Sequence, residues 1–322
     1  MSATQYKKIG SYEIDYEIGA GGLGRVFKGV DTKTGKVVAI KILHEQYQMN
    51  RKFLGIFHRE LLTVSGLKHK NIVPYIGANY EPPDCYIVTE FVDGWPLNRL
   101  IKNFKKIPPL VALSITIDML QGIDYLHLHD TIHSDLSAAN VLISRQGRVL
   151  LTDFGLACKS ELDNYKNYMV GTPGYYSPEH ITESSIRPNS DIYCIGLLLY
   201  EMLTGEKAVL ASKKQEDVLA SMKKIQFSKI KLSERGLQRQ IRSICKKALS
   251  FHSLWRTPNA EKMIFQIYEV LKKYNIRYSR HAIHQYLSET GLALPIPEKY
   301  QQDIYRGLTE PDEDVLTSED ES

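Results

Sequence analysis

Three short segments of this chain carry residues whose types and spacing suit phosphoryl transfer. The first is the glycine-rich stretch 19–26, which lies between two predicted strands. Glycines let a backbone approach phosphate groups closely and leave N–H groups available to negative oxygens. Alone, the stretch is also typical of a glycine-rich hairpin. A dinucleotide-binding site would need a helix after the glycines, whereas residues 25–30 are predicted to form a strand.

A lysine and a glutamate follow at positions where they could meet. Lys41 lies on a predicted β-branched strand, 37–42, and Glu60 lies on a predicted helix, 51–67. A lysine among apolar neighbours must either extend its ammonium group to water or find an anion. Glu60 and the phosphates of a nucleotide would supply that anion. Considered separately, both residues are ordinary surface residues.

The third segment, 133–140, contains Asp135 and Asn140, and the triplet Asp-Phe-Gly follows at 153–155. Phosphoryl transfer needs Mg²⁺ held by oxygen ligands and a carboxylate that accepts the proton of the attacking hydroxyl. Asn140 and Asp153 can hold the metal, which leaves Asp135 for the hydroxyl. The order of the three segments, with the triplet placed just after a predicted strand, favours a phosphotransferase.

The elements that would position these segments divide the chain into two parts. Strand-like alternation dominates residues 12–90, whereas residues 94–274 are mainly helical, and a polar stretch with Gly and Pro separates them. The expected fold class is therefore α+β, with a small antiparallel sheet lobe that carries one helix and a larger helical lobe. The remaining segments are expected to be an N-terminal extension (1–11), a C-terminal extension (275–309) and an acidic disordered tail (310–322).

These motifs resemble the eukaryotic-type (Hanks-type) protein kinase family, in its serine/threonine branch, over residues 12–274. The segment 171–179 is similar to the end of a kinase activation segment, and Arg256 is placed to pair with Glu179. The form of the glycine-rich loop is similar to that of bacterial serine/threonine kinases. The resemblance implies the two-lobed kinase fold and ATP and Mg²⁺ as cofactors. It also implies γ-phosphoryl transfer to serine and threonine hydroxyls of protein substrates, with autophosphorylation.

The resemblance also implies roles for individual residues. Asp135 would be the catalytic base, Lys41 and Glu60 would orient the phosphates, and Asn140 and Asp153 would bind the metal. From periodicity alone, the apolar residues of the implied adenine site would be core residues. The residues expected to contact the nucleotide are Ile18, Gly19, Ala20, Gly21, Gly22, Leu23, Gly24, Arg25, Val26, Ala39, Lys41, Glu90, Val92 and Leu142.

Two positions depart from the family pattern. Ser134 replaces the arginine that usually pairs with a phosphorylated activation loop, so activation is not expected to need that pair. Ser137 replaces a lysine that touches the transferred phosphoryl group, and losing such a cation costs on the order of 10²-fold in rate. We expect an active kinase, because the residues for nucleotide, metal and base are all present. The alternatives are a pseudokinase scaffold or regulatory binding module, and a small-molecule kinase of related fold.

Composition excludes several other classes of protein. The 322 residues are 43% hydrophobic and 24% charged, which excludes fibrous and disordered chains. The four cysteines form no C-x-x-C pair, which favours a reducing compartment over a disulfide framework. The sequence shows no secretory signal and no membrane span, so a cytoplasmic location is expected. The net charge of +4 is too balanced for a dedicated nucleic-acid binder.

The charge is unevenly distributed along the chain. Residues 310–322 carry seven acidic residues and no basic one, so the rest of the chain has a net charge of +11. Region 213–247 carries eleven basic residues against three acidic ones. The hypothesis is that this region attracts an acidic partner or the chain's own tail, and the alternative is a solvated helical face. Residues 278–287 are expected to form a helix that packs on the large lobe, with a partner-binding helix as the alternative.

Overall fold

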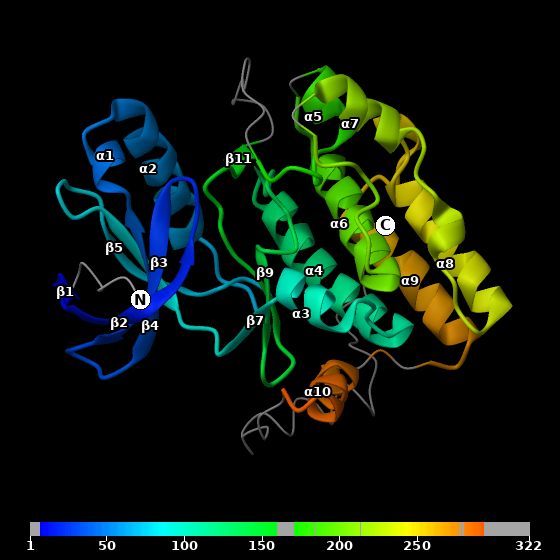
Figure 1. Cartoon of the computed structure of the whole chain (residues 1–322), viewed down its shortest axis with the longest axis horizontal. Helices are drawn as coiled ribbons and strands as arrows, with labels where there is room; N and C mark the ends of the chain where they lie inside the picture. Colours follow the sequence, from blue (N-terminus) through cyan, green and yellow to red (C-terminus); the bar gives the residue numbers. More distant parts are fainter. Residues whose placement is uncertain are drawn as a thin grey trace, which may run out of the picture.

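The computed structural model describes residues 7–159, 171–183, 185–212, 214–276, 278 and 280–292. These residues form two lobes: an antiparallel sheet with helices packed on it in the N-terminal part, and a mainly helical C-terminal part (Figure 1). The predicted α+β class and two-lobed fold are therefore confirmed.

The small lobe is built on a six-stranded antiparallel sheet with the strand order β1-β2-β3-β4-β6-β5. Successive side chains of a strand point to opposite faces. Phe27, Ile40 and Val88 belong to a buried cluster on one face. Val26 pairs with Lys41 in register and therefore lies on the other face. The strands are β1 (Lys8–Ile9), β2 (Tyr12–Ala20), β3 (Gly24–Asp31), β4 (Val37–Leu43), β5 (Tyr75–Asn79) and β6 (Tyr86–Glu90).

Two helices, α1 (Glu45–Gln48) and α2 (Arg51–Ser65), follow β4. The side chain of Asn50 accepts a hydrogen bond from the backbone N–H of Lys52, which caps the N-terminus of α2. The sequence predicts a single helix over 51–67, and the structure adds the short helix α1 before it. Since α2 carries Glu60 on a buried side, its packing decides whether that carboxylate reaches Lys41.

Short strands in the large lobe hold the loops that carry the candidate residues. Strand β9 (Val141–Ser144) lies between β7 (Gly94–Pro96) and β10 (Val149–Leu151), and β8 (Thr131–Ile132) pairs with β11 (Cys158–Lys159). The segment 133–140 therefore connects β8 to β9, and 153–155 lies between β10 and β11. Because β9 pairs with β10 and β8 pairs with β11, the two loops emerge side by side.

The helices of the large lobe pack around α4 and α6, whose side chains are mostly buried. The predicted buried helix over 192–203 is present as part of α6. Among the described residues, no helix is both long and apolar enough to cross a membrane. The helices are α3 (Leu97–Phe104), α4 (Pro109–Leu128), α5 (Pro178–Thr182), α6 (Pro188–Thr204), α7 (Gln215–Met222), α8 (Arg235–Ala248), α9 (Ala260–Lys273) and α10 (Arg280–Glu289), with 3₁₀ turns η1 (Phe227–Lys229) and η2 (Ser253–Trp255).

The helix expected at 278–287 is present as α10, and it packs against α4 below the large lobe (Figure 1). Tyr278 donates its hydroxyl to Asp118 Oδ1 of α4 at 2.5 Å, and Tyr286 contacts Phe104 edge-on, with ring centroids 5.7 Å apart. Ile283 is buried against the same core. The expected acidic tail, 310–322, lies outside the described residues.

The loop between α2 and β5 docks on α4 through His69, and this contact predicts a pH effect on stability. The His69 ring stacks on Tyr125 with centroids 5.0 Å apart, and its Nδ1 accepts a hydrogen bond from the N–H of Asn71. Burial, aided by Lys70, lowers the pKa of His69 from 6.5 to about 4. The unfolded chain therefore takes up the proton first as the pH falls, so this residue's stabilising contribution is complete above the unfolded pKa and is lost toward pH 4.

We expect the difference in free energy of unfolding between the wild type and His69→Gln to shrink steadily from pH 7 to pH 4.5. Glutamine retains a hydrogen-bond acceptor and does not titrate in this range. Urea unfolding followed by circular dichroism at several pH values measures the difference. A difference that stays constant over this range would contradict the neutral, buried state of His69.

Candidate active site

An ion-paired triad lies between the two lobes. Lys41 projects from β4, Glu60 from α2, and Asp153 from the loop after β10. Lys41 Nζ lies 2.7 Å and 2.8 Å from the two oxygens of Glu60 and 2.6 Å from Asp153 Oδ1. The Glu60 side chain is only 6% exposed, whereas that of Asp153 is 44% exposed. The structure therefore brings together three of the predicted site residues, with one carboxylate open to ligands.

The charges of the triad support one another. Burial lowers the pKa of Lys41, but the carboxylates of Asp153 and Glu60 outweigh it, so the net pKa lies above the ordinary value. The Lys41 ammonium in turn holds the pKa of Asp153 below its usual range. Burial raises the pKa of Glu60, and Lys41 opposes this shift. At neutral pH, the site thus presents a fixed cation beside an ionised carboxylate, an arrangement suited to phosphates and a divalent cation.

Asp135 lies in the loop between β8 and β9 and is held by the segment that follows the undescribed residues 160–170. Its Oδ1 accepts hydrogen bonds from both the backbone N–H and the hydroxyl of Thr172, each at 2.8 Å. Burial raises the pKa of Asp135, and the bonds from Thr172 oppose this effect. Thr172 was not among the predicted site residues. The Gly-Thr-Pro sequence in the stretch similar to an activation segment marks its position, but nothing in the sequence indicates its bond to Asp135.

Asp191 of α6 holds the backbone of this loop through hydrogen bonds. It is 1% exposed, and it accepts hydrogen bonds from the backbone N–H groups of His133 (3.0 Å) and Ser134 (3.1 Å) and from His127 Nε2 (2.8 Å). Ser134 has a φ of 68° and Asp153 a φ of 65°, both in the left-handed region that non-glycine residues rarely adopt. Such strain costs on the order of 1–3 kcal/mol per residue, so the surrounding bonds must hold it in place.

Asn140 and Asp153 fit a divalent cation by their donor chemistry. Asn140 donates its Nδ2 to the backbone oxygen of Asp135 at 2.8 Å, which leaves its amide oxygen available as a ligand. Carboxylate and amide oxygens are hard ligands of the kind Mg²⁺ prefers. Within the described ranges, no group of three or more His, Cys, Asp or Glu residues could hold a metal by itself. A cation here would complete its shell with water and phosphate oxygens, which is usual for Mg²⁺.

The residues expected to contact a nucleotide come from several elements. Val26 pairs with Lys41, and Ala39 pairs with Thr89, so both predicted apolar contacts share the sheet face of Lys41. The glycine-rich stretch forms the turn between β2 and β3. At Gly24 a Cβ would lie 2.2 Å from the carbonyl oxygen of Ile42, so the close strand approach requires glycine here.

The other expected contacts come from β2, from β9, and from the end of β6 with the connection that follows it. Ile18 lies near the end of β2 that leads into the glycine-rich turn, and it is 43% exposed. Leu142 lies on β9 and is half-buried. Glu90, at the end of β6, donates its backbone N–H to Pro74 and accepts a side-chain bond from Arg148 at 2.7 Å. Val92 follows in the connection between the lobes. The adenine site and its contacts stay predictions.

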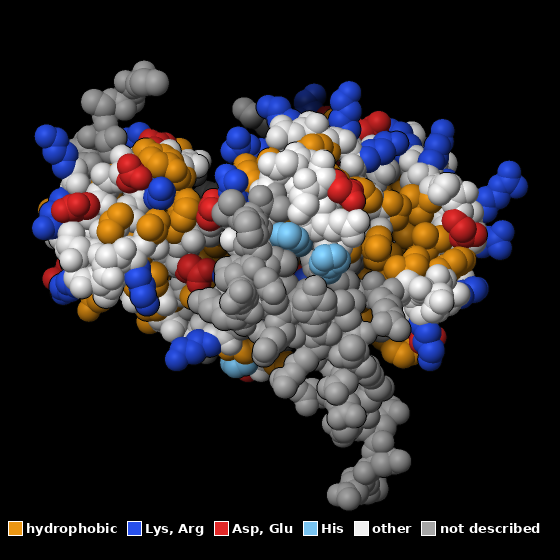
Figure 2. Space-filling view, turned by 90° about the horizontal axis from the view of Figure 1, so that it is seen from below, with side chains coloured by type: hydrophobic (Ala, Val, Ile, Leu, Met, Phe, Trp, Pro, Cys, Tyr) orange, Lys and Arg blue, Asp and Glu red, His pale blue; other side chains and the backbone are white. Residues whose placement is uncertain are grey.

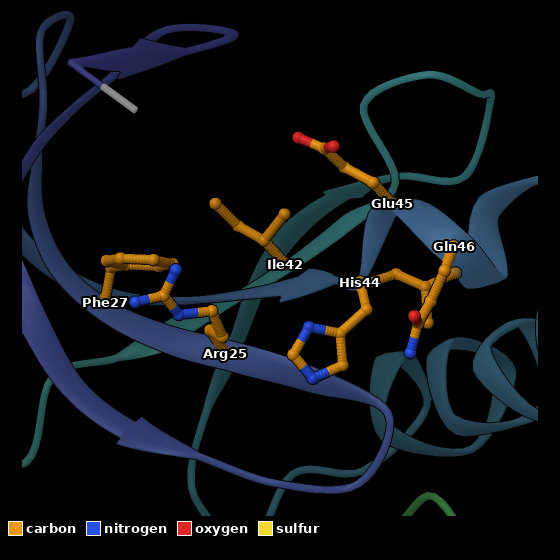
Figure 3. Close-up of a pocket in the computed structure, with 7 residues that line it drawn as sticks. Arg25, Phe27, Ile42, His44, Glu45 and Gln46 are labelled. Carbon is orange, nitrogen blue, oxygen red and sulfur yellow. The ribbon is translucent and has the colours of Figure 1, made fainter. Parts of the chain in front are cut away.

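Arg25 differs from the other predicted contacts in the direction of its side chain. It pairs with Ile42 across β3 and β4, so its side chain lies on the face opposite Lys41. There it bonds to Glu17 and lies over the Phe27 ring, 5.5 Å from its centroid. Arg25 and Phe27, together with Ile42 and His44, line a pocket on the face of the sheet opposite Lys41 (Figure 3). Only the backbone of Arg25 is thus placed near the glycine-rich turn.

His44 ties the glycine-rich turn to the strand that carries Lys41. Its Nε2 lies 3.2 Å from the carbonyl oxygen of Gly21, and its backbone N–H donates to Leu23 at 3.0 Å. Figure 3 shows the His44 ring pointing from the end of β4 toward this turn. We expect His44→Ala to raise the KM for ATP about 3- to 10-fold, since a net hydrogen bond contributes about 0.5–1.5 kcal/mol, and to leave kcat within about twofold.

The control for this prediction is His44→Gln, whose side-chain N–H₂ can donate to the same carbonyl and is expected to restore most of the affinity. Steady-state kinetics with varied ATP at fixed protein substrate separates KM from kcat. An unchanged KM in His44→Ala would show that the contact between His44 and Gly21 does not hold the glycine-rich turn in place.

The two departures from the family pattern have definite surroundings. Ser134 Oγ lies 3.2 Å from Cys158 Sγ, so a neutral contact occupies the position where the family places an arginine. Ser137 is fully buried, and its hydroxyl has no hydrogen-bond partner in the part of the chain that the structure describes. Ser137 therefore does not reach an approaching substrate, and its hydroxyl does not substitute for the missing lysine.

Comparison with known proteins matches a protein kinase domain to residues 12–286. The chain is 39% identical over 198 residues to the probable serine/threonine-protein kinase PknB of Lactococcus lactis, covering 61% of this chain and 32% of that protein. It is 29% identical over 315 residues to the serine/threonine-protein kinase PrkC of Bacillus subtilis, covering 97% of this chain and 48% of that protein. A match of 35% over 211 residues to MAP3K epsilon protein kinase 1 of Arabidopsis thaliana covers 63% of this chain and 15% of that protein.

The chain thus spans less than half the length of these relatives. The matched range contains both lobes, the glycine-rich turn and the ion-paired triad. The resemblance drawn from the sequence motifs is confirmed: the chain belongs to the protein kinase domain family.

Proposed function

We propose that this protein is an ATP-dependent protein kinase that transfers the γ-phosphoryl group to serine and threonine hydroxyls of proteins, including its own. The observation that carries the proposal is the joint placement of two groups. The first is the ion-paired triad of Lys41 with Glu60 and Asp153. The second is the hydrogen-bonded pair of Asp135 and Asn140 in the adjacent loop. This arrangement supplies separate places for phosphates, metal and acceptor hydroxyl.

In the proposed reaction, Lys41 would bind the α- and β-phosphates while Glu60 holds its ammonium group in place. Asn140 and Asp153 would hold Mg²⁺, which neutralises developing phosphate charge when bound. Asp135 would orient the acceptor hydroxyl and take its proton through Oδ2, because Oδ1 is occupied by Thr172. A new bond from the hydroxyl oxygen to Pγ forms as the bond from Pγ to the bridging oxygen breaks, and ADP leaves.

The alternative of a scaffold without turnover rests on Ser137 alone. A protein of this fold that has lost its activity would be expected to lack one of the groups that bind the metal, the phosphates or the proton. All of those groups are present, in two sets of contacting residues: Lys41 contacts Glu60 and Asp153, and Asn140 contacts Asp135. We therefore favour an active enzyme whose rate is reduced by the missing lysine.

Phosphosite mapping tests the proposed function. The full chain is incubated with Mg-ATP and a generic protein substrate, beside an Asp153→Asn control, and the sites are mapped by mass spectrometry. Phosphoserine and phosphothreonine that depend on Asp153 are expected. Phosphotyrosine alone would contradict the serine/threonine assignment, and no incorporation above the control would support the scaffold.

We also propose a cytoplasmic location and an acidic partner for region 213–247. Lys229 in this region pairs with Glu206, and Arg242 donates to the carbonyl of Ile230, so both are engaged within the fold. Many of the other basic residues of this region are exposed. Lys and Arg side chains project around the outer edge of the large lobe (Figure 2). Lys213 and the chain's own tail lie outside the described residues. Deleting residues 310–322 tests the tail as the partner. Unchanged activity and unchanged salt dependence would exclude the tail as the acidic partner.

A further inference from the structure

Lys207 is an exposed lysine that lies against the segment leading away from the catalytic loop. Its Nζ is 3.3 Å from the carbonyl oxygen of Pro173 and 4.5 Å from the centroid of the Tyr175 ring. Gly174 has a φ of 91°, and a Cβ there would lie 3.3 Å from both Cδ and Nζ of Lys207. The absence of a side chain at Gly174 thus lets the lysine stem pack directly on this segment.

The carboxylates closest to Lys207 in the sequence are both engaged by other groups. Glu206 pairs with Lys229 at 2.6 Å. Glu201 is 8% exposed and accepts a hydrogen bond from the hydroxyl of Tyr175. Burial raises the pKa of Glu201, whereas the hydrogen bond from Tyr175 and the charge of Lys207 oppose this shift. The ammonium group of Lys207 therefore adds positive charge at the surface of this segment, since Glu201 is buried and the exposed carboxylate of Glu206 is paired with Lys229.

An acceptor protein must pass close to Lys207 on geometric grounds. On the Oδ2 side of Asp135 lies Asn140, at 3.4 Å, and metal and nucleotide are proposed to bind at Asn140 and Asp153. On the other side Thr172 is bonded directly to Asp135, and the chain continues from it to Pro173. A peptide whose hydroxyl meets Asp135 Oδ2 has to avoid the metal and the nucleotide, so its neighbouring residues would pass over the segment that begins at Thr172. An extended peptide advances about 3.3 Å per residue, so residues near the acceptor lie over this segment.

We propose that Lys207 is a specificity-determining residue that favours protein substrates with an acidic side chain within about three residues of the acceptor serine or threonine. This inference rests on the proposed kinase function. Lys207 would attract a carboxylate and repel a lysine or arginine at the same place. An exposed ion pair contributes up to about 1 kcal/mol, which corresponds to about a 3- to 5-fold preference in kcat/KM.

The test uses three synthetic acceptor peptides of one length, with the same serine and with flanking residues that are all Glu, all Gln or all Lys. For the wild type, kcat/KM is expected to decrease in the order Glu, Gln, Lys, and the preference is expected to weaken at 0.5 M salt, about the range in which surface pairs are screened. Lys207→Glu is expected to reverse the order. Lys262→Glu, an equal charge change on the exposed start of α9, is the matched control and is expected to keep the wild-type order.

A second readout needs no turnover. Fluorescence anisotropy measures the binding of labelled versions of the three peptides with alanine at the acceptor position. If no peptide is phosphorylated but the acidic one binds best and loses this advantage in Lys207→Glu, the kinase proposal fails while the role of Lys207 stands. Equal kcat/KM for the three peptides, or an acidic preference that survives Lys207→Glu, would overturn the inference. Equal binding of the three unphosphorylated peptides would overturn it as well.

Discussion

Asp135→Asn is expected to lower kcat for phosphoryl transfer by about 10²- to 10⁴-fold, the usual contribution of a positioned general base. Asparagine can keep the hydrogen bonds from Thr172, because its amide oxygen accepts them as Oδ1 does now. The loop should therefore keep its shape, and the ion pair of Lys41 with Glu60 is untouched. Nucleotide affinity is expected to stay within about twofold of the wild type, since the change removes proton acceptance rather than phosphate contacts.

Steady-state kinetics and equilibrium binding of ATP measure the two halves of this prediction. Asp84→Asn, at an exposed position of the small lobe, is the matched control and should leave both unchanged. The pH profile adds a further readout. Burial raises the pKa of Asp135, and the base must be ionised, so wild-type activity should fall as the pH drops toward that raised pKa. The residual activity of Asp135→Asn should lack this acid limb, and wild-type kcat in the variant would contradict the role of Asp135.

Arg256→Ala is expected to lower the free energy of unfolding by about 3–5 kcal/mol, which is the usual effect of breaking a buried ion pair. Arg256 donates to both oxygens of Glu179 at 2.7 and 2.8 Å, and both side chains are nearly inaccessible to water, at 0% and 3% exposure. Burial raises the pKa of Glu179, but the bonds and charge of Arg256 outweigh it and lower the net pKa. Without Arg256, this carboxylate would be left charged and uncompensated inside the large lobe.

The matched control is Arg187→Ala, which removes an arginine paired with Glu183 where both side chains are about half exposed. Surface pairs of this kind contribute about 0–1 kcal/mol, so little change is expected. Urea unfolding of both variants measures the contrast. The double variant Arg256→Ala with Glu179→Gln should recover part of the loss, because it removes the buried charge as well. A loss of less than about 1 kcal/mol for Arg256→Ala would contradict the stabilising role of this pair.

The motif residues were predictable because their chemistry requires particular side chains at particular spacings. The sequence alone predicted the association of Lys41 with Glu60 and the α+β division of the chain, and both agree with the structure. The family resemblance implied that Val26 and Ala39 belong to one site, and the strand register places both on the sheet face of Lys41. These features depend on local periodicity or on a known motif, which a sequence displays directly.

Contacts without a periodic signal were not predictable. The bonds from Thr172 to Asp135 and from His44 to the glycine-rich turn join residues far apart in the chain, through groups that are common in any loop. The outward direction of Arg25 follows from strand register, which no single residue reveals. Burial of Ser137 depends on the packing of the whole catalytic loop. Its effect on rate therefore has to be measured.

The measurement that tests the central claim most directly compares ATP binding and γ-phosphoryl transfer in the same preparation of the full chain. Mg-ATP binding is measured by calorimetry, and transfer of labelled γ-phosphate to a protein substrate is followed under single-turnover conditions. Asp153→Asn serves as the control for metal-dependent transfer. The account predicts that the wild type binds Mg-ATP and transfers the label to serine and threonine, whereas Asp153→Asn transfers at least about 100-fold more slowly. Tight Mg-ATP binding by the wild type with no transfer above that control would contradict it.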